Sequence, residues 1–136
     1  MRKESSNSVK IRYAVSKEKA EHLIRQYINK IKRTVGLELA IIFGSYAKGK
    51  YSWGSDIDIL LIAKNLPKRP MDRQQILTYP NTPILIQPFA YTPEEFRKML
   101  KENHPFIIEA LKNGKIVYSK NKNIKYHCNF EIIEEL

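Results

Sequence analysis

Two short, strongly apolar runs near the middle of the chain limit the folds that are open to it. Leu37 to Phe43 and Ile57 to Ala63 are dominated by Ile and Leu and are separated by a polar, glycine-containing connection. Runs of this length and composition are typical of buried β-strands. They are far shorter than the roughly 20 apolar residues needed to cross a bilayer. We therefore expect the two runs to form the centre of a sheet, and we expect no membrane span.

Helical patterns and turn signals flank these runs. Between Ser16 and Gly36, apolar residues recur at three- and four-residue spacing, which predicts a helix with Ser16 as N-cap and Gly36 as its stop. Thr92, followed by Pro93 and then Glu95, predicts a capping box at the start of another helix. The other expected elements are a short helix over 71–77, a strand over 84–91, a helix that begins at Pro105 and a strand over 115–118.

The length of the chain and the order of these elements predict one domain. A chain of 136 residues has the usual size of a single domain. The alternation predicts an α/β (α+β) fold over residues 1–136, with a mixed sheet of about four strands and three or four flanking helices. Pro88 lacks a backbone N–H group, so we expect the strand over 84–91 at a sheet edge or a bulge. Residues 1–15 are expected to form an extended arm or edge strand, and residues 119–136 a tail that docks either on this domain or on a partner chain.

The chain is strongly basic. It has 24 Lys and Arg residues against 14 Asp and Glu residues, which gives a formal net charge of +10. This surplus favours partners that carry phosphate, such as nucleotides and nucleic acid. The basic residues are spread along the chain, so solvated faces and a nucleic-acid or acidic-protein surface both remain open. The polar N-terminus lacks the apolar core of a signal peptide, which predicts a cytoplasmic protein.

Two aspartates stand at the start of the second apolar run. Because side chains alternate along a strand, Asp56 and Asp58 should project from one face, with Ile57 and Ile59 on the opposite, buried face. Two carboxylates in so small a space repel each other, and a divalent cation removes that penalty. Mg²⁺ typically binds one or two protein carboxylates together with water and substrate phosphate oxygens. The pair therefore predicts a magnesium site.

The connection between the two runs has the features of a phosphate-binding turn. Gly44 permits a close backbone approach to a phosphate, and the Ser45 hydroxyl can donate to its oxygens. Lys48, one helical turn further on, is placed to reach the same phosphates, and Ser55 offers another hydroxyl donor. Gly-Ser and Ser-Asp are also common turn sequences. Their combination with the two aspartates favours a nucleotide-binding site.

This segment resembles the signature of the DNA polymerase beta-like nucleotidyltransferase superfamily, in particular its small stand-alone members. The shared pattern is Gly44-Ser45, ten intervening residues and then Asp56-Ile57-Asp58, and the resemblance extends over roughly residues 37–118. It implies Mg²⁺-dependent transfer of a nucleoside monophosphate from an NTP, with ATP expected, to a hydroxyl or protein acceptor, with release of pyrophosphate. It also implies that both aspartates hold two Mg²⁺ ions while Ser45, Gly44 and Lys48 position the triphosphate.

The chain departs from the superfamily at one position. Members normally carry a third carboxylate on the next strand, but this chain has no Asp or Glu between Asp72 and Glu94. Gln87 takes the expected place as a weak metal ligand, and its neutral amide cannot act as a base. Glu94 and Glu95 are alternative carboxylates, although the capping box favours a helix-start role for them.

Three function classes follow from the sequence. The leading one is a nucleotidyltransferase that acts beside a separate helical protein, as an antitoxin that modifies a toxin would, and this partner is implied by the resemblance alone. The second class is a catalytically impaired module that binds a nucleotide or a partner, and it is favoured by Gln87 in place of the third carboxylate. The third class is an RNA-binding protein, which the net charge of +10 favours. Its affinity for RNA would fall steeply as the salt concentration rises.

Overall fold

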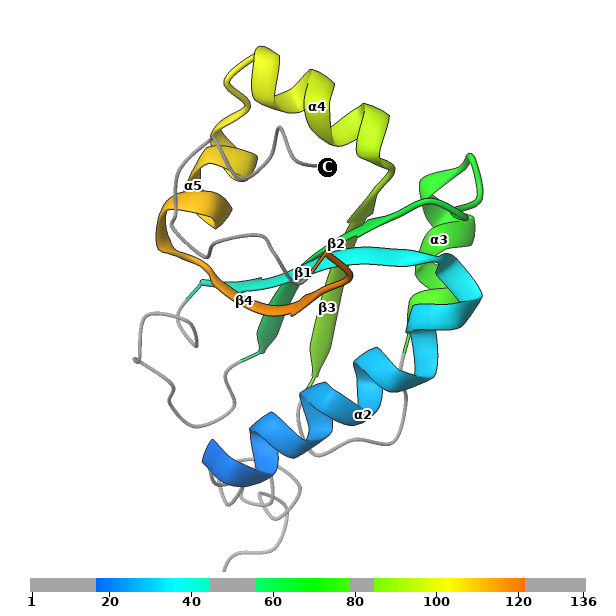
Figure 1. Ribbon diagram of the computed structural model, residues 1–136, viewed down its shortest axis with the longest axis vertical. Helices are drawn as coiled ribbons and strands as arrows, with labels where there is room; N and C mark the ends of the chain where they lie inside the picture. Colours follow the sequence, from blue (N-terminus) through cyan, green and yellow to red (C-terminus); the bar gives the residue numbers. More distant parts are fainter. Residues whose placement is uncertain (1–16, 45–55, 79–84, 122–136) are drawn as a thin grey trace, which may run out of the picture.

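The computed structural model describes residues 17–44, 56–78 and 85–121. In these ranges one mixed four-stranded sheet is combined with four helices, which confirms the predicted fold class (Figure 1). The expected arm over 1–15, the predicted cap Ser16 and the part of the tail beyond residue 121 lie outside these ranges. The elements in chain order are α2 (Lys17–Val35), β1 (Leu37–Phe43), β2 (Ile57–Ala63), α3 (Pro70–Leu77), β3 (Ile86–Tyr91), α4 (Pro93–Lys101), α5 (Pro105–Asn113) and β4 (Lys115–Ser119).

The sheet has the strand order β3-β2-β1-β4. Strand β1 runs antiparallel to both β2 and β4, whereas β3 runs parallel to β2. Pro88 lies on β3, an outer strand of this sheet, as its missing N–H group predicts. The Gln74 Nε2 of α3 donates to the Pro88 carbonyl oxygen over 2.9 Å, so a side chain of α3 provides a hydrogen bond to one backbone carbonyl group of this outer strand.

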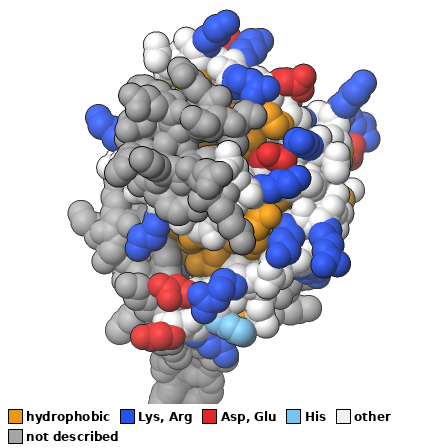
Figure 2. Space-filling view, viewed as in Figure 1, with side chains coloured by type: hydrophobic (Ala, Val, Ile, Leu, Met, Phe, Trp, Pro, Cys, Tyr) orange, Lys and Arg blue, Asp and Glu red, His pale blue; other side chains and the backbone are white. Residues whose placement is uncertain are grey.

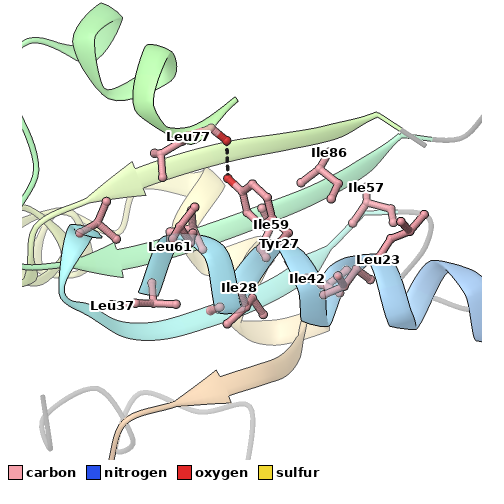
Figure 3. Packing of buried hydrophobic residues seen from close by; sticks show 14 of the residues in the cluster. Leu23, Tyr27, Ile28, Leu37, Ile42, Ile57, Ile59, Leu61, Leu77 and Ile86 are labelled. Carbon is pink, nitrogen blue, oxygen red and sulfur yellow. Dashed lines mark hydrogen bonds between the residues drawn. The ribbon is translucent and has the colours of Figure 1, made fainter. Parts of the chain in front are cut away.

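Helix α2 covers one face of the sheet. Its apolar stripe packs against side chains of β1 and β2, among them Ile57, Ile59 and Leu61, all of which are fully buried (Figure 3). Tyr27 lies in the same cluster, where its hydroxyl donates to the Leu77 carbonyl oxygen over 2.7 Å and burial raises its pKa. Gly36 follows the helix with a φ of +62°, a left-handed conformation that glycine adopts readily, so the predicted helix stop is confirmed.

Helices α4 and α5 cover the opposite face (Figure 1). Leu60 and Ile62 of β2 point to this side and pack with Phe96 of α4 and Ile107 of α5. Because side chains alternate along β2, Asp56 and Asp58 belong to the same face as Leu60. No helix in the described ranges is long and apolar enough to cross a membrane.

Charged side chains are distributed over the surface that Figure 2 shows. Lys and Arg side chains lie at several separate places on that face, and Asp and Glu side chains are fewer. This distribution matches the spread of basic residues along the sequence. The visible face therefore offers a generally positive surface around exposed apolar atoms.

The start of α4 is tied to α3 by a partly buried ion pair. The predicted capping box is present, because Glu95 N donates to Thr92 Oγ1 over 3.2 Å and Thr92 N donates to Glu95 Oε1 over 2.9 Å. Arg73 of α3 donates two further hydrogen bonds to the Glu95 carboxylate, over 2.8 and 3.1 Å. The Arg73 side chain is only 8% exposed, and it also donates to the carbonyl oxygens of Pro67 and Ala90.

We expect this pair to make the protein sensitive to acid. The Arg73 hydrogen bonds, followed by those of Thr92, hold the pKa of Glu95 below its ordinary value of 4.5. A carboxylate with a lowered folded-state pKa stabilises the fold above its unfolded pKa, and this contribution is lost as the pH falls through the folded pKa. At pH 7, E95Q should lower the free energy of unfolding by about 1 kcal/mol, a value reduced for partial exposure.

Denaturant unfolding at pH 7 and pH 3 measures this effect. The deficit of E95Q relative to the wild type should be smaller at pH 3 than at pH 7, because the stabilisation by the Glu95 carboxylate is lost as the pH falls through its lowered folded-state pKa. E94Q is the matched control, since Glu94 is an exposed neighbour in the same helical turn, and it should change stability little at either pH. A deficit of E95Q that is equally large at pH 3 would contradict the assignment.

Candidate functional site

The predicted aspartates lie at one end of the sheet, where β2 begins. Asp56 directly precedes β2 and Asp58 is its second residue. The antiparallel register pairs Asp58 with Phe43 at the end of β1, and the parallel register pairs it with Gln87 near the start of β3. Residues paired in register project from the same face of a sheet. One end of the sheet therefore brings together residues that are far apart in the sequence.

The two carboxylates influence each other. Both Asp56 and Asp58 are partly buried, whereas Ile57 and Ile59 are fully buried on the α2 side. Partial burial raises the pKa of Asp58, and the negative charge of Asp56 raises it further. The repulsion expected from their spacing is thus present in the folded chain, and it favours any cation that binds between them.

Gly44 lies directly beside the Asp58 side chain. Its φ of +83° is left-handed, and a Cβ atom at this position would lie 2.9 Å from Asp58 Oδ2. Real Cβ atoms do not approach other atoms so closely, so both the backbone conformation and the space require glycine. The Asp58 carboxylate can therefore lie next to the bend after β1 only because residue 44 has no side chain.

Gln87 contacts the other carboxylate. Its Nε2 donates a hydrogen bond to Asp56 Oδ2 over 2.9 Å, across the gap between β3 and β2. Gln87 is thus next to the aspartates, at the place where the sequence resemblance expects a third acidic group. Its contact with Asp56 uses an N–H donor, which satisfies a carboxylate oxygen without adding charge.

Glu94 and Glu95 do not join this site. Strands β2 and β3 are parallel, so Tyr91 at the end of β3 pairs with Ile62, far from the start of β2. Both glutamates follow that distant end, and Glu95 is bound by Arg73 and Thr92. Within residues 17–44, 56–78 and 85–121, no group of three or more His, Cys, Asp or Glu side chains is arranged to hold a metal ion.

An aromatic cluster lies beside the carboxylates on the same face, and no local sequence pattern predicts it. Phe106 of α5 lies 5.0 Å from Phe43 and 5.1 Å from Phe89, measured between ring centroids. Phe43 is the register partner of Asp58, and Phe89 follows Gln87 by two residues on β3. Only the alternation on each strand could have indicated this proximity, and alternation does not reveal which strands are neighbours.

The donor set fits one hard divalent cation. Two neighbouring carboxylates supply the anionic oxygens that Mg²⁺ binds, and a cation between them would relieve their repulsion. Ser45, Lys48 and Ser55 lie outside the described residues, so their phosphate-binding roles stay predictions. The internal segments 45–55 and 79–84 contain no Asp, Glu, His or Cys residue.

Comparison with known proteins agrees with this arrangement. The family model described as "Polymerase beta, Nucleotidyltransferase" matches residues 25–123. Two similar proteins come from Methanocaldococcus jannaschii. One, "Putative protein adenylyltransferase MJ1305", is 35% identical over 108 residues, which are 74% of this chain and 72% of that protein. The other, "Putative protein adenylyltransferase MJ0141", is 32% identical over 78 residues, which are 57% of this chain and 76% of that protein.

A solved structure has a similar fold. The crystal structure of a "putative nucleotidyltransferase" from Sulfolobus solfataricus superimposes with a TM-score of 0.53. The match covers 89% of this chain and 93% of that one at 20% sequence identity. At this identity the likeness concerns the fold, and it agrees with the mixed sheet that carries the two aspartates.

Proposed function

Because the chain belongs to the polymerase beta nucleotidyltransferase family and is a nucleotidyltransferase, we propose that it transfers the nucleoside monophosphate of ATP to a side-chain hydroxyl of another protein. The observation that carries this proposal is the pair Asp56 and Asp58 beside the bend at Gly44. The choice of ATP as the donor and of a protein as the acceptor goes beyond membership of the family. This choice is supported by the names of both relatives from Methanocaldococcus jannaschii.

Asp56 and Asp58 are the residues that would hold Mg²⁺. When bound, this ion neutralises charge on the triphosphate and on the departing pyrophosphate. Gly44, which has no side chain, lets the triphosphate approach the backbone closely. Ser45 and Lys48 are the predicted phosphate ligands on the following segment.

The transfer is an in-line substitution at the α-phosphorus. The acceptor oxygen forms a bond to the α-phosphorus, and the bond from this phosphorus to the oxygen that bridges to the β-phosphate breaks. Pyrophosphate leaves with that electron pair, and the acceptor proton passes to solvent or to a base on the acceptor. Catalysis of this kind depends mainly on holding the reactants in line and on balancing charge. The start of β2 is suited to that task, because Asp58 lies in a buried strand and Asp56 directly precedes it.

Label transfer from radioactive ATP tests the proposal. The full chain is incubated with Mg²⁺ and either α- or γ-labelled ATP, together with candidate acceptor proteins or RNA. We expect label from α-labelled ATP alone to appear on a protein, and we expect EDTA to abolish the transfer. Label on RNA would contradict the protein acceptor, and label from γ-labelled ATP would contradict nucleotidyl transfer.

A nucleotide-binding module without transfer is the second candidate. The observation that favours it is the Gln87 amide, which occupies the place next to Asp56 without offering a base. Calorimetric titration with ATP and Mg²⁺, combined with the label-transfer assay, separates the two candidates. Mg²⁺-dependent binding of ATP without transfer to any acceptor would support the module, whereas transfer supports the enzyme.

A further inference from the structure

We propose that the site binds one divalent cation together with its nucleotide, and that Gln87 is the residue that limits the number to one. The inference rests on the proposed function, because it concerns how the same site is loaded. It differs from the two ions that the sequence resemblance implies. The contact that carries it joins Gln87 Nε2 to Asp56 Oδ2 over 2.9 Å.

The first argument is one of charge. The nucleotide brings the charge of its own triphosphate, and the charge that the described part of the protein adds here is the two negative charges of Asp56 and Asp58. Paired catalytic ions lie about 3.5–4 Å apart, and their repulsion grows with the product of their charges. A second ion, held by the protein and not by the triphosphate, would therefore need a further anionic side chain close to the first ion. The nearest described side chain on β3 is Gln87, which is neutral.

The second argument is one of geometry. Gln87 directs an N–H group at Asp56 Oδ2, and its Oε1, the atom of the amide that can coordinate a cation, carries no negative charge. The hydrogen bond occupies part of the oxygen that a second ion would share, and it holds the Asp56 carboxylate toward β3. On the β1 side, the positions next to Asp58 are Phe43 and Gly44, which offer no side-chain oxygen. Gln87 is thus a positioning residue for the one-cation site.

The isosteric variant Q87E tests this role. It places a carboxylate oxygen where the amide nitrogen now lies, 2.9 Å from Asp56 Oδ2, and a second cation would relieve the resulting repulsion. Q75E is the matched control, because Gln75 is exposed on α3 and the substitution adds the same charge. Both variants and the wild type are studied as full chains.

Electron paramagnetic resonance counts the ions without measuring activity. Each protein is saturated with α,β-methylene ATP, which cannot be cleaved at the reacting bond, and titrated with Mn²⁺. We expect one nucleotide-dependent Mn²⁺ per chain in the wild type and in Q75E, with the signal of an isolated ion. In Q87E we expect a second Mn²⁺ that binds at least tenfold more tightly than any second ion in the wild type, and the signal of coupled neighbouring ions.

The number of Mn²⁺ ions bound per chain distinguishes a failure of this inference from a failure of the proposed function. Two coupled Mn²⁺ ions in the wild type would overturn the inference and leave the proposed function intact, and an unchanged count in Q87E would also overturn the inference. A wild type that binds no nucleotide-dependent Mn²⁺ would overturn both. The wild-type count is decisive by itself, so the test still applies if Q87E does not fold.

Discussion

Asp58→Asn is expected to lower nucleotidyl transfer by about a thousandfold while it raises the stability of the metal-free protein. The loss follows because an amide cannot supply the negative charge that balances a divalent cation and its triphosphate. Interactions of this kind contribute several kcal/mol to the transition state, and about 4 kcal/mol corresponds to a thousandfold change in rate. The measurement is the initial rate of label transfer at saturating Mg²⁺ and ATP.

The gain in stability follows from the pKa of Asp58. Burial and the charge of Asp56 raise this pKa, so the folded state disfavours the charged form more than the unfolded state does. The penalty is present above the raised folded-state pKa, and it is lost as the pH falls through this pKa toward the unfolded-state value. In EDTA, the melting temperature of D58N should therefore exceed that of the wild type at pH 7, and the difference should shrink in acid.

Asp72→Asn is the matched control for both readouts. Asp72 forms an exposed ion pair with Arg69 on α3, remote from the start of β2. Surface pairs contribute little, so D72N should lower stability only slightly and should leave transfer unchanged. A D58N protein that retains a tenth or more of the wild-type rate, or that melts below the wild type at pH 7, would contradict the account.

Gly44→Ala is expected to impair both stability and transfer. The left-handed backbone at Gly44 costs a residue with a Cβ atom about 1–2 kcal/mol. The added methyl group would also lie 2.9 Å from Asp58 Oδ2, so the carboxylate must move. Displacement of a catalytic group by about 1 Å can lower a rate by about a hundredfold. We therefore expect a loss of about 1–3 kcal/mol in unfolding free energy and about a hundredfold in transfer.

Gly36→Ala separates backbone strain from the effect on the site. Gly36 also has a left-handed φ, of +62°, and a Cβ there would meet the Asn65 side chain at 2.9 Å. Asn65 is exposed, so its amide can swing away from the methyl group. G36A should lose about 1–2 kcal/mol of stability and retain full transfer. Equal losses of transfer in G36A and G44A, measured beside their melting temperatures, would show that Gly44 has no special relation to Asp58.

Local signals predicted most of the elements correctly. The apolar runs became β1 and β2 because short stretches rich in Ile and Leu are stable only when both faces of the sheet are covered. The stop at Gly36 and the capping box between Thr92 and Glu95 depend on residues within one helical turn, so the sequence contains the whole signal. The alternation around Asp58 likewise predicted which side chains of β2 face α2.

Contacts between distant segments could not be predicted in the same way. The parallel register that places Gln87 beside the aspartates depends on how β3 returns to the sheet. The close fit of Gly44 to Asp58 depends on the distance between two strand ends. The ion pair between Arg73 and Glu95 joins two helices, and nothing near Arg73 in the sequence indicates that its side chain is buried. In each case three-dimensional packing, and not local propensity, decides the contact.

A crystal structure of the full chain with Mg²⁺ and α,β-methylene ATP tests whether Asp56, Asp58 and Gly44 form a nucleotide site. We expect a cation bound by oxygens of both carboxylates and of the triphosphate, with the phosphates against the bend that follows β1. Nucleotide and cation bound elsewhere, or carboxylates that turn away from each other and contact only neighbouring protein groups, would contradict this account.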